Sequence, residues 1–212
     1  MYSVKEIFYS IQGEGFHSGT PVVFCRLSGC NLWNGKESDR SSAICKFCDT
    51  DFLGTDGTHG GKYNSANKLA KSIEACCPSG FLSMDKKTVV FTGGEPLLQL
   101  DKNLVDAMHR AGFFVAIETN GTILPPGNVD WICVSPKAGA NLVVDFGDEL
   151  KLVYPQQNCD PSMFEEMHFD HFYLQPMDGP RLRQNMQEAL SYCLRNPKWK
   201  VSIQTHKVIG AR

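Results

Sequence analysis

The sequence has no excess of either charge. Its 21 Lys and Arg residues are balanced by 23 Asp and Glu residues, which leaves a formal net charge of −2. Broad binding to nucleic-acid phosphates or to an anionic membrane requires a basic excess. The composition therefore gives no support to either class of function, and we expect no direct nucleic-acid partner.

Long apolar runs are also absent. No stretch reaches the roughly 18–20 apolar residues that cross a bilayer, and residues 1–6 lack the basic and apolar regions of a secretory signal peptide. No internal repeat or low-complexity tract occurs. These absences predict a cytoplasmic protein with no membrane partner, and the 212 residues predict a single domain over 1–212.

Cysteine, in contrast, is abundant, with nine residues. An odd count without an export signal favours reduced thiols over disulfides, which makes metal binding an early hypothesis. Cys45 and Cys48 form a C-x-x-C pair, and fourteen residues separate Cys30 from Cys45. Three thiolates near one point suit a zinc ion or an iron–sulfur cluster. Zinc would need a fourth ligand, for which His59 is a candidate, whereas a three-cysteine [4Fe–4S] cluster leaves one iron open.

The other six cysteines lie in or near apolar, turn or helical segments. We interpret them as small, mostly buried residues. They are Cys25, Cys76, Cys77, Cys133, Cys159 and Cys193.

Apolar strand-like runs alternate with helical segments. Strands are predicted at 2–11, 21–27, 88–91, 113–117, 131–134, 150–154, 172–174 and 199–204, and helices at 65–77, 101–112 and 181–194. This alternation predicts an α/β fold with a mostly parallel sheet. Only about eight residues separate 121 from the strand at 131, too few for a return helix, so we expect an incomplete, TIM-like barrel with few helices.

Polar motifs follow the predicted strands. They are Thr92–Glu95, Glu118–Gly121, Ser135–Lys137, Gln175–Asp178 and Gln204–Lys207. Active sites of parallel sheets and barrels form at the C-terminal ends of the strands. The five motifs therefore predict one polar pocket at that rim, although any one of them alone would be interpreted as a turn.

The motifs together resemble those of the radical S-adenosylmethionine superfamily and, within it, the 7-carboxy-7-deazaguanine synthase family. The matching blocks are 12–15, 24–26, 29–33, 47–51, 92–96, 118–121, 135–137 and 175–179. The superfamily usually spaces its cysteines C-x3-C-x2-C, and some members of this synthase family resemble the chain in having an expanded first gap. On this resemblance, the long polar stretch 31–64 is a cluster-loop insertion.

The resemblance implies a [4Fe–4S] cluster on Cys30, Cys45 and Cys48, and S-adenosylmethionine on its open iron. The residues implied to bind S-adenosylmethionine are Phe47, Asp49, Gly94, Ser135, Pro136, Lys137, Gln175, Pro176, Met177 and Asp178, with Glu118 as a weaker candidate. Lys137 is suited to offset the carboxylate charge of S-adenosylmethionine.

The implied substrate is 6-carboxy-5,6,7,8-tetrahydropterin. Arg26 is suited to pair with the carboxylate of this substrate, although it could instead be a structural ion-pair partner. Gln12 and Glu14 are suited to read the flat donor–acceptor edge of the pterin. The remaining candidate contacts are Ile11, Gly13, Thr92, His206 and the C-terminal Arg212. The resemblance also implies Mg²⁺ between Thr50 and the substrate carboxylate. Whether Asp49 or Asp51 shares that metal stays open.

The implied reaction is a radical ring contraction with loss of ammonia, a lyase step of queuosine and deazapurine biosynthesis. No catalytic side chain is assigned, because the cofactor-derived radical carries the chemistry. The resemblance also implies a homodimer and a reductase such as flavodoxin or ferredoxin. Two alternatives are an activase that places a glycyl radical on a partner protein, and a zinc-stabilised binding module. Gln12, Glu14 and Arg26 favour a small-molecule pocket over the activase.

Overall fold

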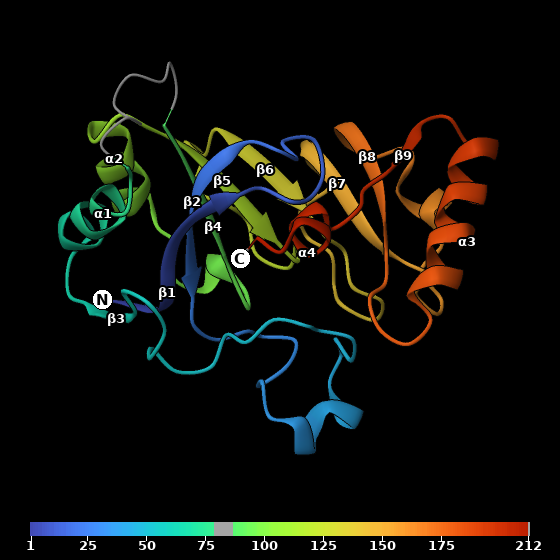
Figure 1. Ribbon diagram of the computed structural model, residues 1–212, viewed down its shortest axis with the longest axis horizontal. Helices are drawn as coiled ribbons and strands as arrows, with labels where there is room; N and C mark the ends of the chain where they lie inside the picture. The colour runs from blue at the N-terminus through green and yellow to red at the C-terminus, as the bar shows by residue number, and fades with distance from the viewer. Residues whose placement is uncertain (79–86, 212) are drawn as a thin grey trace.

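A single nine-stranded sheet organises the chain (Figure 1). The computed structural model describes residues 1–78 and 87–211. The strands are β1 (Tyr2–Ile11), β2 (Pro21–Leu27), β3 (Gly61–Tyr63), β4 (Lys87–Gly93), β5 (Phe113–Thr119), β6 (Trp131–Val134), β7 (Phe146–Tyr154), β8 (His168–Pro176) and β9 (Trp199–Val201). Their order is β3-β1-β2-β4-β5-β6-β7-β8-β9.

Most of the sheet is parallel. β1 runs antiparallel to β2 and β3, and every neighbouring pair from β2 to β9 is parallel. β3 and β9 are the two edges of the sheet, which therefore does not close into a ring in the described part of the chain. The expected open α/β barrel is confirmed.

Few helices accompany the strands. They are α1 (Ala66–Ala75), α2 (Lys102–Arg110), α3 (Leu182–Arg195) and α4 (Thr205–Ile209), with short 3-10 helices η1 (Glu37–Ser42), η3 (Pro96–Leu98) and η4 (Pro161–Phe164). Figure 1 shows α1 and α2 side by side at one end of the sheet and α3 at the other. The segment that carries η1 projects away from the strands.

Strand alternation gives the sheet one apolar and one polar face. In β2, Val23, Cys25 and Leu27 are fully buried, whereas Phe24 and Arg26 line the cavity described below. Near the ends of β4, β5, β7 and β8 the inner positions Thr92, Glu118, Lys151 and Gln175 also line that cavity, whereas Val22, Val90 and Ala116 form a small apolar cluster on the same face. The apolar face is therefore left for the helices to cover.

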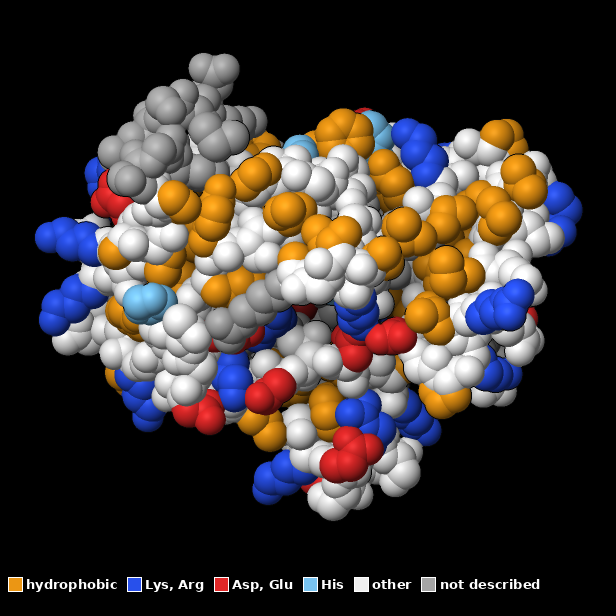
Figure 2. All heavy atoms as spheres, viewed as in Figure 1, with side chains coloured by type: hydrophobic (Ala, Val, Ile, Leu, Met, Phe, Trp, Pro, Cys, Tyr) orange, Lys and Arg blue, Asp and Glu red, His pale blue; other side chains and the backbone are white. Residues whose placement is uncertain are grey.

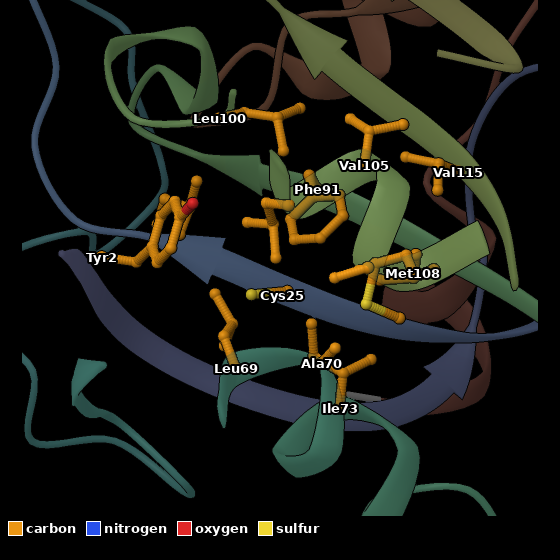
Figure 3. Packing of buried hydrophobic residues seen from close by; sticks show 14 of the residues in the cluster. Tyr2, Cys25, Leu69, Ala70, Ile73, Phe91, Leu100, Val105, Met108 and Val115 are labelled. Atoms are coloured by element: carbon orange, nitrogen blue, oxygen red, sulfur yellow. The ribbon is translucent and has the colours of Figure 1, made fainter. Parts of the chain in front are cut away.

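Two hydrophobic clusters lie on that outer face. The larger joins α1 and α2 to β1, β2, β4 and β5. Figure 3 shows Leu69 and Ile73 of α1 and Met108 of α2 around Cys25 and Phe91. The second cluster joins α3 to β6–β9 and includes the buried Trp199.

Cysteines outside the C-x-x-C region behave largely as expected. Cys25, Cys133 and Cys159 are buried, whereas Cys76, Cys77 and Cys193 are half-buried. None of the nine, all of which are described, forms a disulfide.

Several predicted segment boundaries need correction. The stretch 31–64 is not only loop, since it contains η1 and also β3, which pairs with β1 through Tyr63 and Tyr2. The last strand ends at Val201 rather than Gln204, because its pairing with β8 stops at Val201 and α4 begins at Thr205. β7 and β8 begin four residues earlier than their predicted starts at 150 and 172, because they pair with each other from Phe146 and His168 onward.

No helix in the described ranges has the length and apolar character needed to span a membrane.

The α2 N-cap provides a test of the fold. Asp101 Oδ1 accepts the Leu104 N–H at 3.0 Å and the Tyr2 hydroxyl at 2.8 Å, which ties the helix to β1. Asp101→Ala should lower the free energy of unfolding by about 1–2 kcal/mol, measured by urea denaturation. Lys102→Ala, beside it on the exposed surface, should leave the midpoint unchanged. Equal loss in both variants would contradict the role of the cap.

Candidate functional site

A cavity of about 430 Å³ lies against the polar inner face of the sheet. The predicted strand-end motifs all contribute to its lining, through Thr92, Glu118, Ser135, Gln175 and Lys207 among others. The prediction that these motifs converge on one rim is confirmed. The projecting segment supplies another part of the wall, from Cys30 and Leu32 to Phe52.

The three candidate cluster cysteines open onto this cavity. A hydrogen bond from the Cys45 thiol lowers the pKa of Cys48 against the effect of burial, and raises that of Cys45. Cys30 Sγ accepts the Leu32 N–H at 3.4 Å. Burial nevertheless raises the pKa of Cys30.

The three thiols border one space, as the ligands of a cluster must. No three His, Cys, Asp or Glu side chains in the described ranges converge as ligands of one metal ion. In a [4Fe–4S] cluster each thiolate binds a different iron, so the sulfur atoms need only border one space. His59, the candidate fourth zinc ligand, is not among the cavity-lining residues.

Glycine at position 94 brings β4 against the Cys30 segment. A Cβ there would lie 2.3 Å from the Gly29 carbonyl oxygen and 2.7 Å from Cβ of Cys30. The next residue, Glu95, donates its N–H to the same Gly29 carbonyl at 2.9 Å. The close approach therefore depends on the absence of a side chain.

The Glu95 carboxylate joins two strand ends from behind the cavity wall. It is fully buried and accepts Thr119 Oγ1 at 2.8 Å and the N–H groups of Asn120 at 2.7 Å and Leu97 at 2.9 Å. Burial raises the pKa of Glu95, and these hydrogen bonds oppose that shift. The Gly-Gly-Glu motif thus connects the end of β4 to the end of β5 and to the Cys30 segment.

Lys137 lies at the cysteine side of the cavity. Its Nζ donates to the Ser135 carbonyl at 2.6 Å and to Ser135 Oγ at 2.7 Å. Burial lowers the pKa of Lys137, and the charge of the Cys45 thiolate would oppose that effect. Pro136, also predicted to line the site, is buried outside the lining, and its carbonyl accepts Gln156 Nε2 at 3.2 Å.

On the side of the cavity away from the cysteines, Glu14 is the residue around which the polar contacts are arranged. Its Oε2 lies 2.6 Å from Lys151 Nζ, and its Oε1 accepts Gln175 Nε2 at 3.0 Å and Gln204 Nε2 at 2.9 Å. Burial would raise the pKa of Glu14, but the charge and hydrogen bond of Lys151 outweigh it and hold that pKa at about 2. Glu14 is therefore ionised at neutral pH.

Glu118 belongs to the same group of charges. It accepts Gln12 Nε2 at 2.9 Å and lies 3.3 Å from Lys151 Nζ. This places Glu118 beside the side chains predicted to read a pterin edge, whereas the sequence suggested the S-adenosylmethionine pocket. Lys151 itself was missed, although Glu149 and Lys151 on one face of an apolar strand were a usable signal.

Arg26 lines the cavity from β2 and pairs with Glu6 of β1. Its Nε lies 2.9 Å from Glu6 Oε1. The ion pair uses Nε alone, and a guanidinium carries two further donor nitrogens. The structural and substrate-binding interpretations of Arg26 are therefore compatible.

Thr50 lines the cavity between two acidic neighbours that have lysine partners. Asp49 lies 2.8 Å from Lys207, and Asp51 lies 2.8 Å from Lys5. The Thr50 hydroxyl donates to Asp49 Oδ1 at 3.4 Å.

Helix α4 closes the cavity beside Gly13. Thr205 donates its N–H to the Gly13 carbonyl at 2.8 Å, and the His206 ring lies where a Cβ on Gly13 would be. Lys207 bridges Asp49 and Asp178, at 2.8 and 2.5 Å. The structural roles of Gln204 and Lys207 were missed, because they depend on α4 (Thr205–Ile209), a helix that was not predicted after the strand expected to end at Gln204.

The remaining predicted residues fall into two groups. Ile11, Phe47, Pro176 and Met177 line the cavity, as do Gln12, Gly13, Thr92 and His206. Arg212 lies outside the described residues.

Comparison with known proteins gives full-length relatives, although no family model matches the chain. The 7-carboxy-7-deazaguanine synthase of Bradyrhizobium diazoefficiens is 57% identical over 211 residues, covering 100% of this chain and 99% of that protein. The protein of the same name from Bacteroides thetaiotaomicron is 40% identical over 212 residues, covering 100% of both chains.

A solved structure supports the fold. QueE from Escherichia coli matches with a TM-score of 0.67 at 24% identity, covering 97% of this chain and 94% of that one. At that identity the likeness establishes the open α/β sheet and nothing finer.

Lys151 provides a test of the buried charges. Lys151→Met leaves Glu14 and Glu118 without their cation, so the free energy of unfolding should fall by about 3–5 kcal/mol at pH 7. Adding Glu14→Gln should recover part of that loss, which urea denaturation of the single and double variants would measure. Additive losses would contradict the coupling.

The same pair predicts the pH dependence. The pKa of Glu14 is about 2 in the folded protein, against an ordinary value of 4.5. The ionised carboxylate therefore stabilises the fold fully above about pH 4.5, and this contribution is lost as the pH falls through the folded-state pKa. The unchanged protein should therefore lose this contribution only below about pH 4.5, whereas Lys151→Met should lack it throughout.

Proposed function

The chain belongs to the 7-carboxy-7-deazaguanine synthase family, and from this membership we propose that it converts 6-carboxy-5,6,7,8-tetrahydropterin to 7-carboxy-7-deazaguanine with loss of ammonia. The observation that carries the proposal is the shared cavity: three thiols border one part of it, and Gln12, Glu14 and Arg26 border another. Neither the glycyl-radical activase nor the zinc module accounts for both parts.

We propose that Cys30, Cys45 and Cys48 hold a [4Fe–4S] cluster, with S-adenosylmethionine beside it. When bound, the two supply the 5′-deoxyadenosyl radical that starts the ring contraction. Lys137, half-buried at the cysteine side, offers a cation for the carboxylate of S-adenosylmethionine. The cavity wall around this position is supplied by Phe47, by Gln175 to Asp178 and by the Gly93–Gly94 backbone.

The substrate is proposed to lie between Glu14 and Arg26. An ionised carboxylate accepts two parallel N–H groups, which is the pattern at the amino-pyrimidinone edge of a pterin. Lys151 keeps Glu14 in that state, and Gln12 is held in place by Glu118. Arg26 provides a fork for the substrate carboxylate.

A Mg²⁺ ion is proposed between Thr50 and that carboxylate. Mg²⁺ takes oxygen ligands and retains waters, so one protein oxygen suffices when the substrate supplies another. Because Lys207 and Lys5 engage Asp49 and Asp51, the arrangement favours the Thr50 hydroxyl over either carboxylate.

Further parts of the proposal rest on family resemblance. We propose that a flavodoxin or ferredoxin supplies the electron, that the chain forms a homodimer, and that it acts in the cytoplasm. We also propose that residues 1–212 form one domain, with 31–64 as the cluster-loop insertion.

The reaction itself is directly testable. Anaerobically reconstituted protein, given S-adenosylmethionine, a reductant, Mg²⁺ and the tetrahydropterin, should form 7-carboxy-7-deazaguanine, detected by mass spectrometry. Cys48→Ala should abolish product and 5′-deoxyadenosine together. Cys76→Ala, at the C-cap of α1 and outside the cavity lining, should retain both.

The outcomes separate the parts of the proposal. Accumulation of 5′-deoxyadenosine without the deazapurine would refute the substrate while leaving the radical chemistry in place. Loss of neither product in Cys48→Ala would refute the cluster assignment.

Thr50 provides a separate test of the metal. Thr50→Val removes the hydroxyl while nearly preserving shape, so stimulation by Mg²⁺ should disappear. Thr50→Ser keeps the oxygen and should retain stimulation. Titration of Mg²⁺ against initial rate for the three proteins distinguishes these results, and unchanged stimulation in Thr50→Val would assign the metal elsewhere.

A further inference from the structure

Arg40 contacts the backbone of the C-x-x-C segment from within the expanded first gap. It lies in η1, between Cys30 and Cys45. Its Nη1 donates to two carbonyl oxygens, those of Lys46 and Cys48, at 3.0 Å each. The Lys46 carbonyl belongs to the peptide group before Phe47 and the Cys48 carbonyl to the one after Cys48, so one guanidinium nitrogen holds the backbone on both sides of this pair of residues.

The guanidinium is itself held on two other sides. Its Nε lies 2.8 Å from both carboxylate oxygens of Glu37, and its central carbon lies 4.1 Å from the centroid of the Trp33 ring. Trp33 is buried, packs edge-on against Phe52 at 5.6 Å, and donates Nε1 to the Lys36 carbonyl at 3.2 Å. Arg40 thus connects a small apolar centre of the projecting segment to the C-x-x-C turn.

We propose that Arg40 is a positioning residue that braces the C-x-x-C turn for cluster binding, so that the expanded gap carries a structural device of its own. The inference rests on the proposed function, because it concerns how the cysteines are presented to a cluster. Fixing the carbonyls of residues 46 and 48 restricts the directions in which the Cys45 and Cys48 side chains leave the backbone. Arginine suits this task, since its planar group stacks on an aromatic ring while donating in fixed directions, which lysine does not do.

Simple charge is the competing explanation. Figure 2 shows basic and acidic side chains interspersed over the lower part of this face, where the projecting segment lies. Lys46 supplies the matched control, because its side chain is exposed and only its backbone carbonyl meets Arg40. Lys46→Met removes one positive charge from the C-x-x-C turn itself and leaves that carbonyl in place.

The experiment compares the unchanged protein with Arg40→Met, Arg40→Lys and Lys46→Met after anaerobic reconstitution. Iron and sulfide per chain are measured first, followed by the rate of iron release to a chelator and the electron paramagnetic resonance spectrum of the reduced cluster, with and without S-adenosylmethionine. Both Arg40 variants should release iron about tenfold faster, the factor for one lost charge-assisted hydrogen bond. They should also alter the spectral change caused by S-adenosylmethionine, whereas Lys46→Met should match the unchanged protein.

Hydrogen exchange in the cluster-free proteins provides a readout independent of iron. Amides in 44–50 should exchange faster in both Arg40 variants, with β1 and β5 unaffected, which also shows that the variants fold. Unchanged exchange and iron release in Arg40→Met would overturn the proposal. Full rescue by Arg40→Lys, or equal effects of Lys46→Met, would assign the effect to charge and overturn it as well. Failure of the unchanged protein to take up iron would instead refute the proposed function.

Discussion

The buried ion pair between Lys151 and Glu14 connects the two sides of the open sheet. Lys151 comes from β7, whereas Glu14 follows β1, and their atoms lie 2.6 Å apart. The inner face of this open sheet carries a small apolar cluster around Val22, Val90 and Ala116, and the buried charged side chains beside it require partners across the cavity. Gln12 from the segment of Glu14, and Glu118, Gln175 and Gln204 from three further segments, complete this arrangement. The geometry of the substrate side thus depends on one lysine.

The cysteine side is built on backbone contact instead. Gly94 and Glu95 place the end of β4 against Gly29 and Cys30, and Glu95 then binds the end of β5 through Thr119 and Asn120. The projecting segment is therefore anchored to the two strands at its first cysteine. Its other two cysteines depend on contacts made within the segment and on Lys207 of α4, which reaches Asp49.

Local signals in the sequence were sufficient for much of this architecture. β1, β2 and β6 have the predicted bounds, since alternating or apolar runs ended by polar turns are properties of the segment itself. Asp101 caps α2 as expected. The strand-end motifs predicted the cavity because parallel strands bring their C-terminal ends together.

Features that depend on distant partners could not be predicted in this way. β3 is a strand because three residues pair with β1, and α4 is a helix docked on Gly13, after a strand that ends three residues early. The Lys207–Asp49 pair joins positions 158 residues apart. Which strands pair, where a helix docks and which charges meet are set by the folded arrangement. The family resemblance supplied candidate site residues, but Lys151 and Lys207 were not among them.

The hydrogen bonds of Glu14 show how the substrate side is prepared. A carboxylate oxygen offers two in-plane lone pairs, and Oε1 accepts one amide from Gln175 and one from Gln204, while Oε2 accepts Lys151. The same carboxylate is proposed to receive two N–H groups of the pterin. The amide donors therefore satisfy Oε1, and together with Lys151 they fix the orientation and charge of the carboxylate. An acceptor fixed in this way avoids the cost of ordering a free side chain.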